Sequence, residues 1–161
     1  MDFNKLWANF MDTVQNHYMD FNGRVPRAQF WYYILVAVLI GVVAAILGGI
    51  VGTTLVSAVV SLALLLPNAG MAARRMQDTG RSGQLVWIWV IVGGIYGVLN
   101  LMMGLAGPLG AVAFLYFFLS IGWLISLAML VVSIAIIYFC AQPGQAEANA
   151  YGPVPPAWTP N

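Results

Sequence analysis

Four charged side chains lie within ten residues, in the segment RRMQDTGRSG at positions 74–83. They are Arg74, Arg75, Asp78 and Arg81, in a chain of 161 residues that has only six Lys or Arg and five Asp or Glu. Arginine forks and the backbone N–H groups of glycine-rich turns bind phosphate well. An aspartate among arginines also forms ion pairs with them. The segment is therefore either an anion-binding site or a set of ion pairs that joins helix ends.

The sequence offers few groups for catalysis. General acid–base catalysis needs a positioned titratable group, and Asp78, among arginines, is better explained as an ion-pair partner. His17 and Cys140 are the only histidine and cysteine. No intrachain disulfide can form, and a His/Cys metal site lacks ligands. We predict that the protein is not an enzyme and that it holds no metal and no cofactor.

The composition is that of an integral membrane protein. Hydrophobic residues make up 61% of the chain and charged residues 7%, whereas about a quarter of the residues of a soluble domain are charged. The formal net charge is +1. Six cations are too few for a protein that neutralises a nucleic-acid backbone, so we predict no nucleic-acid partner.

Four apolar runs are long enough to cross a hydrocarbon core of about 30 Å, which needs about 20 helical residues. They predict an all-α membrane domain at 23–140, with helices at 28–51, 53–73, 85–106 and 111–140. Glycine and proline clusters separate the first run from the second and the third run from the fourth. The fourth run is longer than a span requires, so it either tilts or begins at the interface, and its early aromatic residues favour the second.

Small and polar residues inside the runs predict how the helices pack. Small residues recur one turn apart, which allows close packing either within the bundle or in a homo-oligomer. Pro67 interrupts the second run, and we expect Asn68 to satisfy the carbonyl that this proline frees.

The cations predict the orientation in the membrane. All of them lie before the first run or between the second and the third: Lys5, Arg24, Arg27, Arg74, Arg75 and Arg81. With four crossings they share one face, which the positive-inside rule assigns to the cytoplasm. Both termini are then cytoplasmic. In the charged connection we expect Thr79 or Ser82 to cap the start of the third helix.

The two ends of the chain differ from the apolar middle. Apolar residues recur at spacings of three and four through the first 21 residues, which predicts an amphipathic interfacial helix at 1–22. Residues 141–161 contain five prolines and no aliphatic run, which predicts an extended Pro-rich cytoplasmic tail.

Three segments together resemble a known family. Residues 21–31 (FNGRVPRAQFW) resemble F-x-G-R-x-x-R-x-E-Y/F-W, residues 74–83 resemble R-R-L-H-D-T-G-R-S-G, and residues 143–153 (PGQAEANAYGP) resemble P-G-x-x-G-x-N-x-Y-G-P. These patterns are similar to those of the bacterial inner-membrane family called domain of unknown function 805. The resemblance implies a small multi-helix inner-membrane protein and carries no established activity.

The chain departs from the family patterns at several positions. Gln29 stands where the first pattern has glutamate, Gln77 where the second has histidine, and Glu147 where the third has its second glycine. Glutamine does not titrate, which disfavours proton exchange next to Asp78.

These observations together predict a binding function. All three segments fall on the predicted cytoplasmic face, where the arginines converge with Asp78, Asp20 and Glu147 as partners. The candidate residues for binding an anion, a lipid or a partner are Arg24, Arg27, Arg74, Arg75, Asp78, Thr79, Arg81, Ser82 and Tyr151. We predict a scaffold or accessory protein of the inner membrane whose arginine-rich cap binds anionic lipid head groups or a membrane-protein partner. The alternative is a small oligomeric channel or uncoupled transporter, for which the interrupted second run is the best feature.

Overall fold

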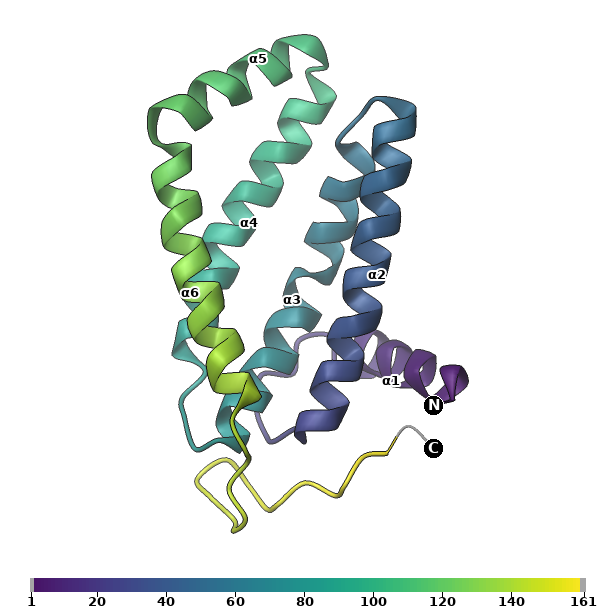
Figure 1. Ribbon diagram of the computed structural model, residues 1–161, viewed down its shortest axis with the longest axis vertical. Helices are drawn as coiled ribbons and strands as arrows, with labels where there is room; N and C mark the ends of the chain where they lie inside the picture. Colours follow the sequence, from purple (N-terminus) through teal and green to yellow (C-terminus); the bar gives the residue numbers. More distant parts are fainter. Residues whose placement is uncertain (1, 160–161) are drawn as a thin grey trace.

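The computed structural model describes residues 2–159, and among them it contains helices and no strand. The elements, shown in Figure 1, are α1 (Phe3–Asn16), α2 (Arg27–Val51), α3 (Leu55–Asp78), α4 (Gln84–Leu105), α5 (Pro108–Phe117), the π-helical segment η1 (Phe118–Gly122) and α6 (Trp123–Ala141). Four stretches are long and apolar enough to cross a membrane: α2, α3, α4 and the continuous stretch from α5 to α6. The all-α class and the four predicted spans are therefore confirmed.

The helices form an up-and-down bundle with both chain ends at one end (Figure 1). α3 packs along α2 and α4, and α6 packs on α3 and α4. We call the end that carries the termini and the connection between α3 and α4 the charged end. Much of the buried core lies toward this end, where Phe30 and Tyr33 of α2 pack with Met71 and Met76 of α3 and with Cys140 of α6.

α3 is longer than its apolar run. The sequence predicted its end at residue 73, but the helix continues to Asp78 and includes Arg74 and Arg75 in its last turns. Residues three apart lie on one helix face, so this extension brings Arg75 and Asp78 together. Hydropathy marked the end too early because these charged side chains are buried by other parts of the chain.

Pro67 is accommodated differently from the prediction. Its missing N–H leaves the carbonyl of Ala63 without a helical donor, and the Tyr18 hydroxyl donates to that carbonyl at 2.6 Å. Asn68 instead accepts from the Tyr33 hydroxyl at 2.8 Å. The prediction that Asn68 satisfies the freed carbonyl is wrong, because a tyrosine far away in sequence reaches that carbonyl.

The fourth apolar run is bent. α5 leans across the end of the bundle opposite the termini, and α6 returns toward the charged end (Figure 1). The five-residue π-helical segment between them, η1, joins the two directions. The position of α5 relative to the membrane surface stays a prediction.

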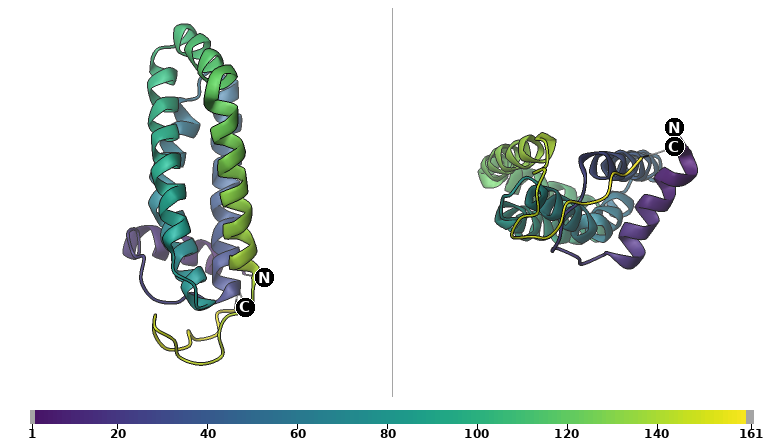
Figure 2. Two further views of the ribbon diagram at one scale, coloured as in Figure 1. Left: turned by 90° about the vertical axis from the view of Figure 1, so that its left-hand side faces the viewer. Right: turned by 90° about the horizontal axis from the view of Figure 1, so that it is seen from below.

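α1 rests against the bundle near the charged end (Figure 2). Leu6 and Phe10 are buried, and the Phe10 ring stacks on Tyr33 with centroids 5.6 Å apart. The Asn9 amide donates to the carbonyl of Gln29 at 3.1 Å, which ties α1 to the start of α2. The helix ends at Asn16, earlier than the predicted boundary at 22, and its place at a membrane interface stays a prediction.

The loop after α1 passes very close to α3 at Gly70. A Cβ at this position would lie 2.7 Å from the carbonyl oxygen of Asp20. We therefore expect Gly70→Ala to destabilise the protein by about 1–3 kcal/mol, because the backbone must move to admit one methyl group. Thermal unfolding in detergent measures this. Gly41→Ala in α2, where a Cβ meets nothing within 4 Å, is the matched control, and an equal melting temperature for both variants would contradict the prediction.

Candidate functional site at the charged end

Asp78 lies at the centre of the charged end and is buried between two arginines. One carboxylate oxygen accepts from Arg24 Nε at 2.9 Å, and the other accepts from Arg75 Nη1. The side chains are 5% exposed for Asp78, 1% for Arg24 and 0% for Arg75. Burying charges in this way is tolerated only when the remaining polar atoms are also hydrogen-bonded.

Arg24 meets that requirement through the tail. Its Nη2 donates to the carbonyl of Gln145 at 2.6 Å, and its Nη1 donates to the carbonyls of Glu147 at 2.8 Å and Gly152 at 3.2 Å. Arg24 belongs to the loop before α2, so its guanidinium joins that loop to α3 through Asp78 and to the tail through these carbonyls. Glu147, predicted to pair through its carboxylate, contributes its main-chain carbonyl here.

Arg75 meets the same requirement through the end of α6. Its Nε donates to the carbonyl of Cys140 at 2.9 Å, and its Nη2 donates to the carbonyl of Gln142. Its Nη1 also reaches the carbonyl of Val25 at 3.4 Å. We call Arg24, Arg75, Asp78 and the carbonyls that the two arginines bind the arginine lock. It holds the loop before α2, the end of α3 and the end of α6 together.

The tail folds against the lock before it runs along the underside of the bundle (Figure 2). The Gln145 N–H donates to the carbonyl of Asp78 at 2.9 Å, and the Asn149 amide donates to the carbonyl of Gln77 at 2.9 Å. Asn149 and Gly152 exchange two main-chain hydrogen bonds, at 3.1 and 3.0 Å, which close a tight turn. Residues 142–152 are thus bent and hydrogen-bonded, which differs from the extended tail that the proline content predicted.

Glycine is required where the tail passes Asp78. A Cβ at Gly144 would collide with Asp78 Oδ2 and would lie tightly against Oδ1, at 3.2 Å. Further along, Trp158 packs on Tyr32 of α2, with ring centroids 5.4 Å apart. The tail therefore crosses the charged end from α6 to α2.

Arg74 points to the other side of α3, toward the loop after α1. Its Nη1 lies 3.8 Å from Asp20 Oδ2, and its Nη2 lies 3.2 Å from the sulfur of Met71. The side chain is 10% exposed. Within residues 2–159, its Nε is buried without a hydrogen-bond partner. The predicted partnership with Asp20 is present as this long ion pair, outside the lock.

The remaining predicted residues lie around the lock. Arg27 and Ser82 are exposed, and the exposed Arg81 guanidinium lies 4.4 Å above the ring of Phe139. The Thr79 hydroxyl donates to the carbonyl of Met76 at 2.7 Å, and Gly83 holds the N-cap position of α4 without a side-chain hydrogen bond. The prediction that Thr79 or Ser82 caps this helix is therefore wrong. The Tyr151 N–H donates to the side chain of Asn149 at 2.8 Å.

The chain can also be compared in sequence with known proteins. The family model described as "Protein of unknown function (DUF805)" matches residues 18–153. The chain belongs to this family. Inner membrane protein YhaI of Escherichia coli K12 is 28% identical over 142 residues, which cover 87% of this chain and 89% of that protein. YhaI of Escherichia coli O157:H7 matches to the same extent. No solved structure matches the chain.

The DUF805 match covers the whole arginine lock, from Arg24 to the carbonyl of Gly152, and leaves out α1. This DUF805 chain is thus a multi-pass membrane protein, similar to an inner-membrane protein, with its family-matching segments joined at one end.

Five of the nine candidate residues of this DUF805 protein form an internal and an external group, whereas the buried Arg74 pairs with Asp20 outside both. Arg24, Arg75 and Asp78 bind one another and main-chain carbonyls. Arg27 and Arg81 are exposed. The guanidinium donors of Arg24 and Arg75 are already engaged within the protein, whereas those of the exposed Arg27 and Arg81 face outward. Among residues 2–159 there is no group of three or more His, Cys, Asp or Glu placed to hold a metal ion.

Sequence reasoning missed the polar residues that join the tail and the loop before Arg24 to the end of α3, beside the arginine lock. Gln145 and Asn149, which begins the tight turn of the tail, bind main-chain atoms of α3. Gln77 donates to the carbonyl of Phe21 at 2.9 Å, which fixes the loop before Arg24. The available signal was the tail pattern itself, because glycine and asparagine at fixed places in a Pro-rich segment indicate a defined turn.

Proposed function

We propose that this DUF805 protein acts by binding and not by catalysis, as an accessory protein of the inner membrane whose charged end faces the cytoplasm and binds anionic lipid head groups. The observation that carries this proposal is the division of the arginines. The internal ones are used to build the end of the bundle, and the exposed Arg27 and Arg81 remain for an external anion.

The positive-inside rule supports the cytoplasmic orientation. Both termini lie at the charged end (Figure 1), and every Lys and Arg of the chain lies before α2, at its first residue, near the end of α3 or in the connection that follows it. The segments at the opposite end, residues 52–54 and 106–107, carry no charge. If the charged end faced outside, the cations before α2 and those around the connection between α3 and α4 would lie outside, which violates the rule.

The state of Asp78 supports a function without catalysis. Both of its oxygens accept hydrogen bonds from buried arginines, so neither is free to take a proton from a substrate. His17 lies elsewhere, on the side of α1, with Nδ1 3.1 Å from Asp20 and Nε2 3.7 Å from Asp12.

The neighbours of the exposed arginines support lipid as the ligand. Trp31 follows Arg27 by one helical turn and is 37% exposed, and Trp87 follows Arg81 by six residues and is 48% exposed. Tryptophan is enriched at the level of the head groups, and each Arg near an anionic membrane surface contributes about 1 kcal/mol.

Native mass spectrometry tests the proposal on protein reconstituted with phosphatidylglycerol and phosphatidylcholine. We expect the wild type to retain phosphatidylglycerol preferentially, and Arg27→Gln with Arg81→Gln to reduce that preference by about thirtyfold, because two head-group contacts of about 1 kcal/mol each are lost. Arg27→Lys with Arg81→Lys keeps both charges and is the matched control. If the glutamine variant keeps the full preference, lipid binding by this end is refuted.

A further inference from the structure

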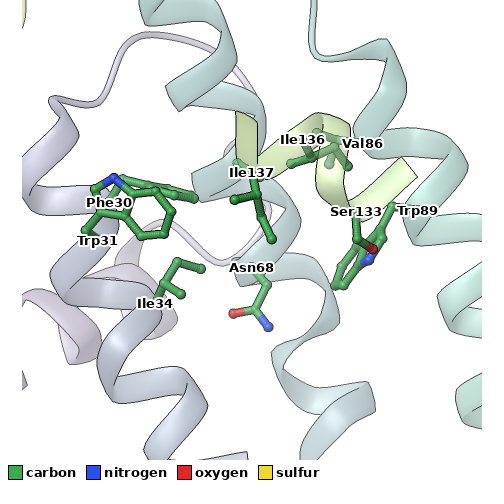
Figure 3. A pocket seen from close by; sticks show the side chains of 10 residues that line it. Phe30, Trp31, Ile34, Asn68, Val86, Trp89, Ser133, Ile136 and Ile137 are labelled. Atoms are coloured by element: carbon green, nitrogen blue, oxygen red, sulfur yellow. The ribbon is translucent and has the colours of Figure 1, made fainter. Parts of the chain in front are cut away.

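A pocket lies inside the membrane-spanning part, separate from the arginine lock. It has a volume of about 260 Å³ and is lined by residues of α2, α3, α4 and α6. Figure 3 shows Phe30, Trp31, Trp89 and Ile136 among its apolar walls, together with two polar side chains, Asn68 and Ser133. A neighbouring pocket of about 360 Å³ shares Asn68 and Trp89 with it, so the hollow continues along α3 toward the middle of the bundle.

Asn68 brings an unused donor to this pocket. Its amide oxygen accepts from the buried Tyr33 hydroxyl at 2.8 Å, which fixes the direction of the amide group. The amide nitrogen then lies on the side away from α2, next to the open space of the pocket (Figure 3). Among residues 2–159 no acceptor is hydrogen-bonded to this nitrogen. By contrast, the Asn100 amide in α4 donates to the carbonyl of Tyr96 at 2.8 Å.

Ser133, like the Asn68 amide nitrogen, has no hydrogen-bond partner among residues 2–159, and in this it differs from the other serines of the membrane-spanning helices. Ser57, Ser61 and Ser120 donate to carbonyls of their own helical segments, and Ser126 shares a hydrogen bond with Tyr96. The Ser133 hydroxyl makes no hydrogen bond within the described part of the chain and faces the pocket. Two polar groups without a hydrogen-bond partner in the described part of the chain therefore line one apolar pocket.

The surroundings define what would satisfy these groups. No bulk water reaches a hydrocarbon core, and a donor left without an acceptor there is unfavourable by several kcal/mol. Asn68 precedes Arg74 by six residues, which places it about 9 Å along the helix from the arginine level. An apolar molecule that reaches this depth can offer a carbonyl oxygen to Asn68 Nδ2 and another to Ser133 Oγ.

We propose that the pocket between α2, α3, α4 and α6 binds a lipid-soluble molecule through its carbonyl oxygens, with Asn68 and Ser133 each donating to one of them and the aromatic and aliphatic walls around its apolar body. An ester carbonyl of a phospholipid and a ring carbonyl of a quinone share this chemistry. The site is distinct from the charged end and does not depend on the function proposed for it.

The test uses the full chain in nanodiscs and compares two phosphatidylethanolamines with the same chains, one ester-linked and one ether-linked. A second arm adds decylubiquinone. We expect native mass spectrometry to show either about tenfold preferential retention of the diester lipid or specific retention of decylubiquinone, since one good hydrogen bond is worth about a factor of ten. The first result identifies a phospholipid ester and the second a quinone.

Variants connect the retention to the two donors. Ser133→Ala changes little volume, and Asn68→Leu is combined with Tyr33→Phe so that no hydroxyl is left without an acceptor. We expect each variant to lower the preference several-fold, because each removes one of the two donors, while Ser61→Ala, whose hydroxyl binds its own helix, keeps it. Equal retention of diester and diether lipid with no bound quinone would overturn the proposal. So would an undiminished preference in the folded Ser133→Ala protein.

Discussion

Asp78→Asn is expected to lower the stability of the protein by about 3–5 kcal/mol, because it leaves two buried arginine charges without a counter-charge. The side chains of Arg24 and Arg75 are 1% and 0% exposed, so water cannot replace the lost carboxylate without opening the charged end. The asparagine amide would also direct N–H groups at arginine donors. Thermal unfolding of the purified protein in mild detergent should show a melting temperature lower by about 10 °C.

The same substitution is expected to release the tail. Gln145 and Glu147 are held through the Arg24 guanidinium, whose position depends on Asp78. Proteinase K should therefore cut the Asp78→Asn tail at least several times faster than that of the wild type. Glu147→Gln is the matched control, because this exposed residue uses only its main-chain carbonyl in the lock. A tail equally protected in Asp78→Asn and in the wild type would show that Asp78 does not organise this end.

The sequence predicts the membrane helices well, because a span is a property of local composition. The end of α3 is the instructive exception. Arg74, Arg75 and Asp78 were assigned to a loop because charged side chains are rarely buried, yet these residues are helical and buried. The burial of Arg75 and Asp78 depends on the end of α6 and on the tail, more than 60 residues later, and no window of local sequence contains those contacts.

The location of the candidate site was predictable from the sequence, and its main-chain acceptors were not. The four-crossing topology and the three family-like segments placed the arginines and Asp78 at one end, which the structure agrees with. The acceptors of Arg24 and Arg75 were not predictable, since a main-chain carbonyl is present at every residue and has no sequence signature. For the same reason the partner of the carbonyl freed by Pro67 was assigned to adjacent Asn68, when Tyr18 supplies it.

Substitutions of Arg75 separate two explanations of the lock. Either Arg75 serves mainly as the counter-charge of Asp78, or its planar fork is needed to join α6, the loop before α2 and α3. Its Nε, Nη1 and Nη2 donate to the carbonyls of Cys140, Val25 and Gln142 as well as to Asp78. A lysine ammonium is a single point charge and cannot reach acceptors spread around a guanidinium.

We therefore expect Arg75→Lys to be strongly destabilising even though it keeps the charge. Arg75→Met should lose about 3–5 kcal/mol by leaving Asp78 half-paired and three carbonyls without donors. Arg75→Lys should lose at least about 2 kcal/mol, because most of those carbonyls still lose their donor. Urea or thermal unfolding in detergent measures both. Arg81→Lys is the control, since the exposed Arg81 lies over Phe139 outside the lock and should change stability by no more than about 0.5 kcal/mol. A fully stable Arg75→Lys protein would show that charge alone is sufficient, and the lock would then reduce to the ion pairs of Asp78.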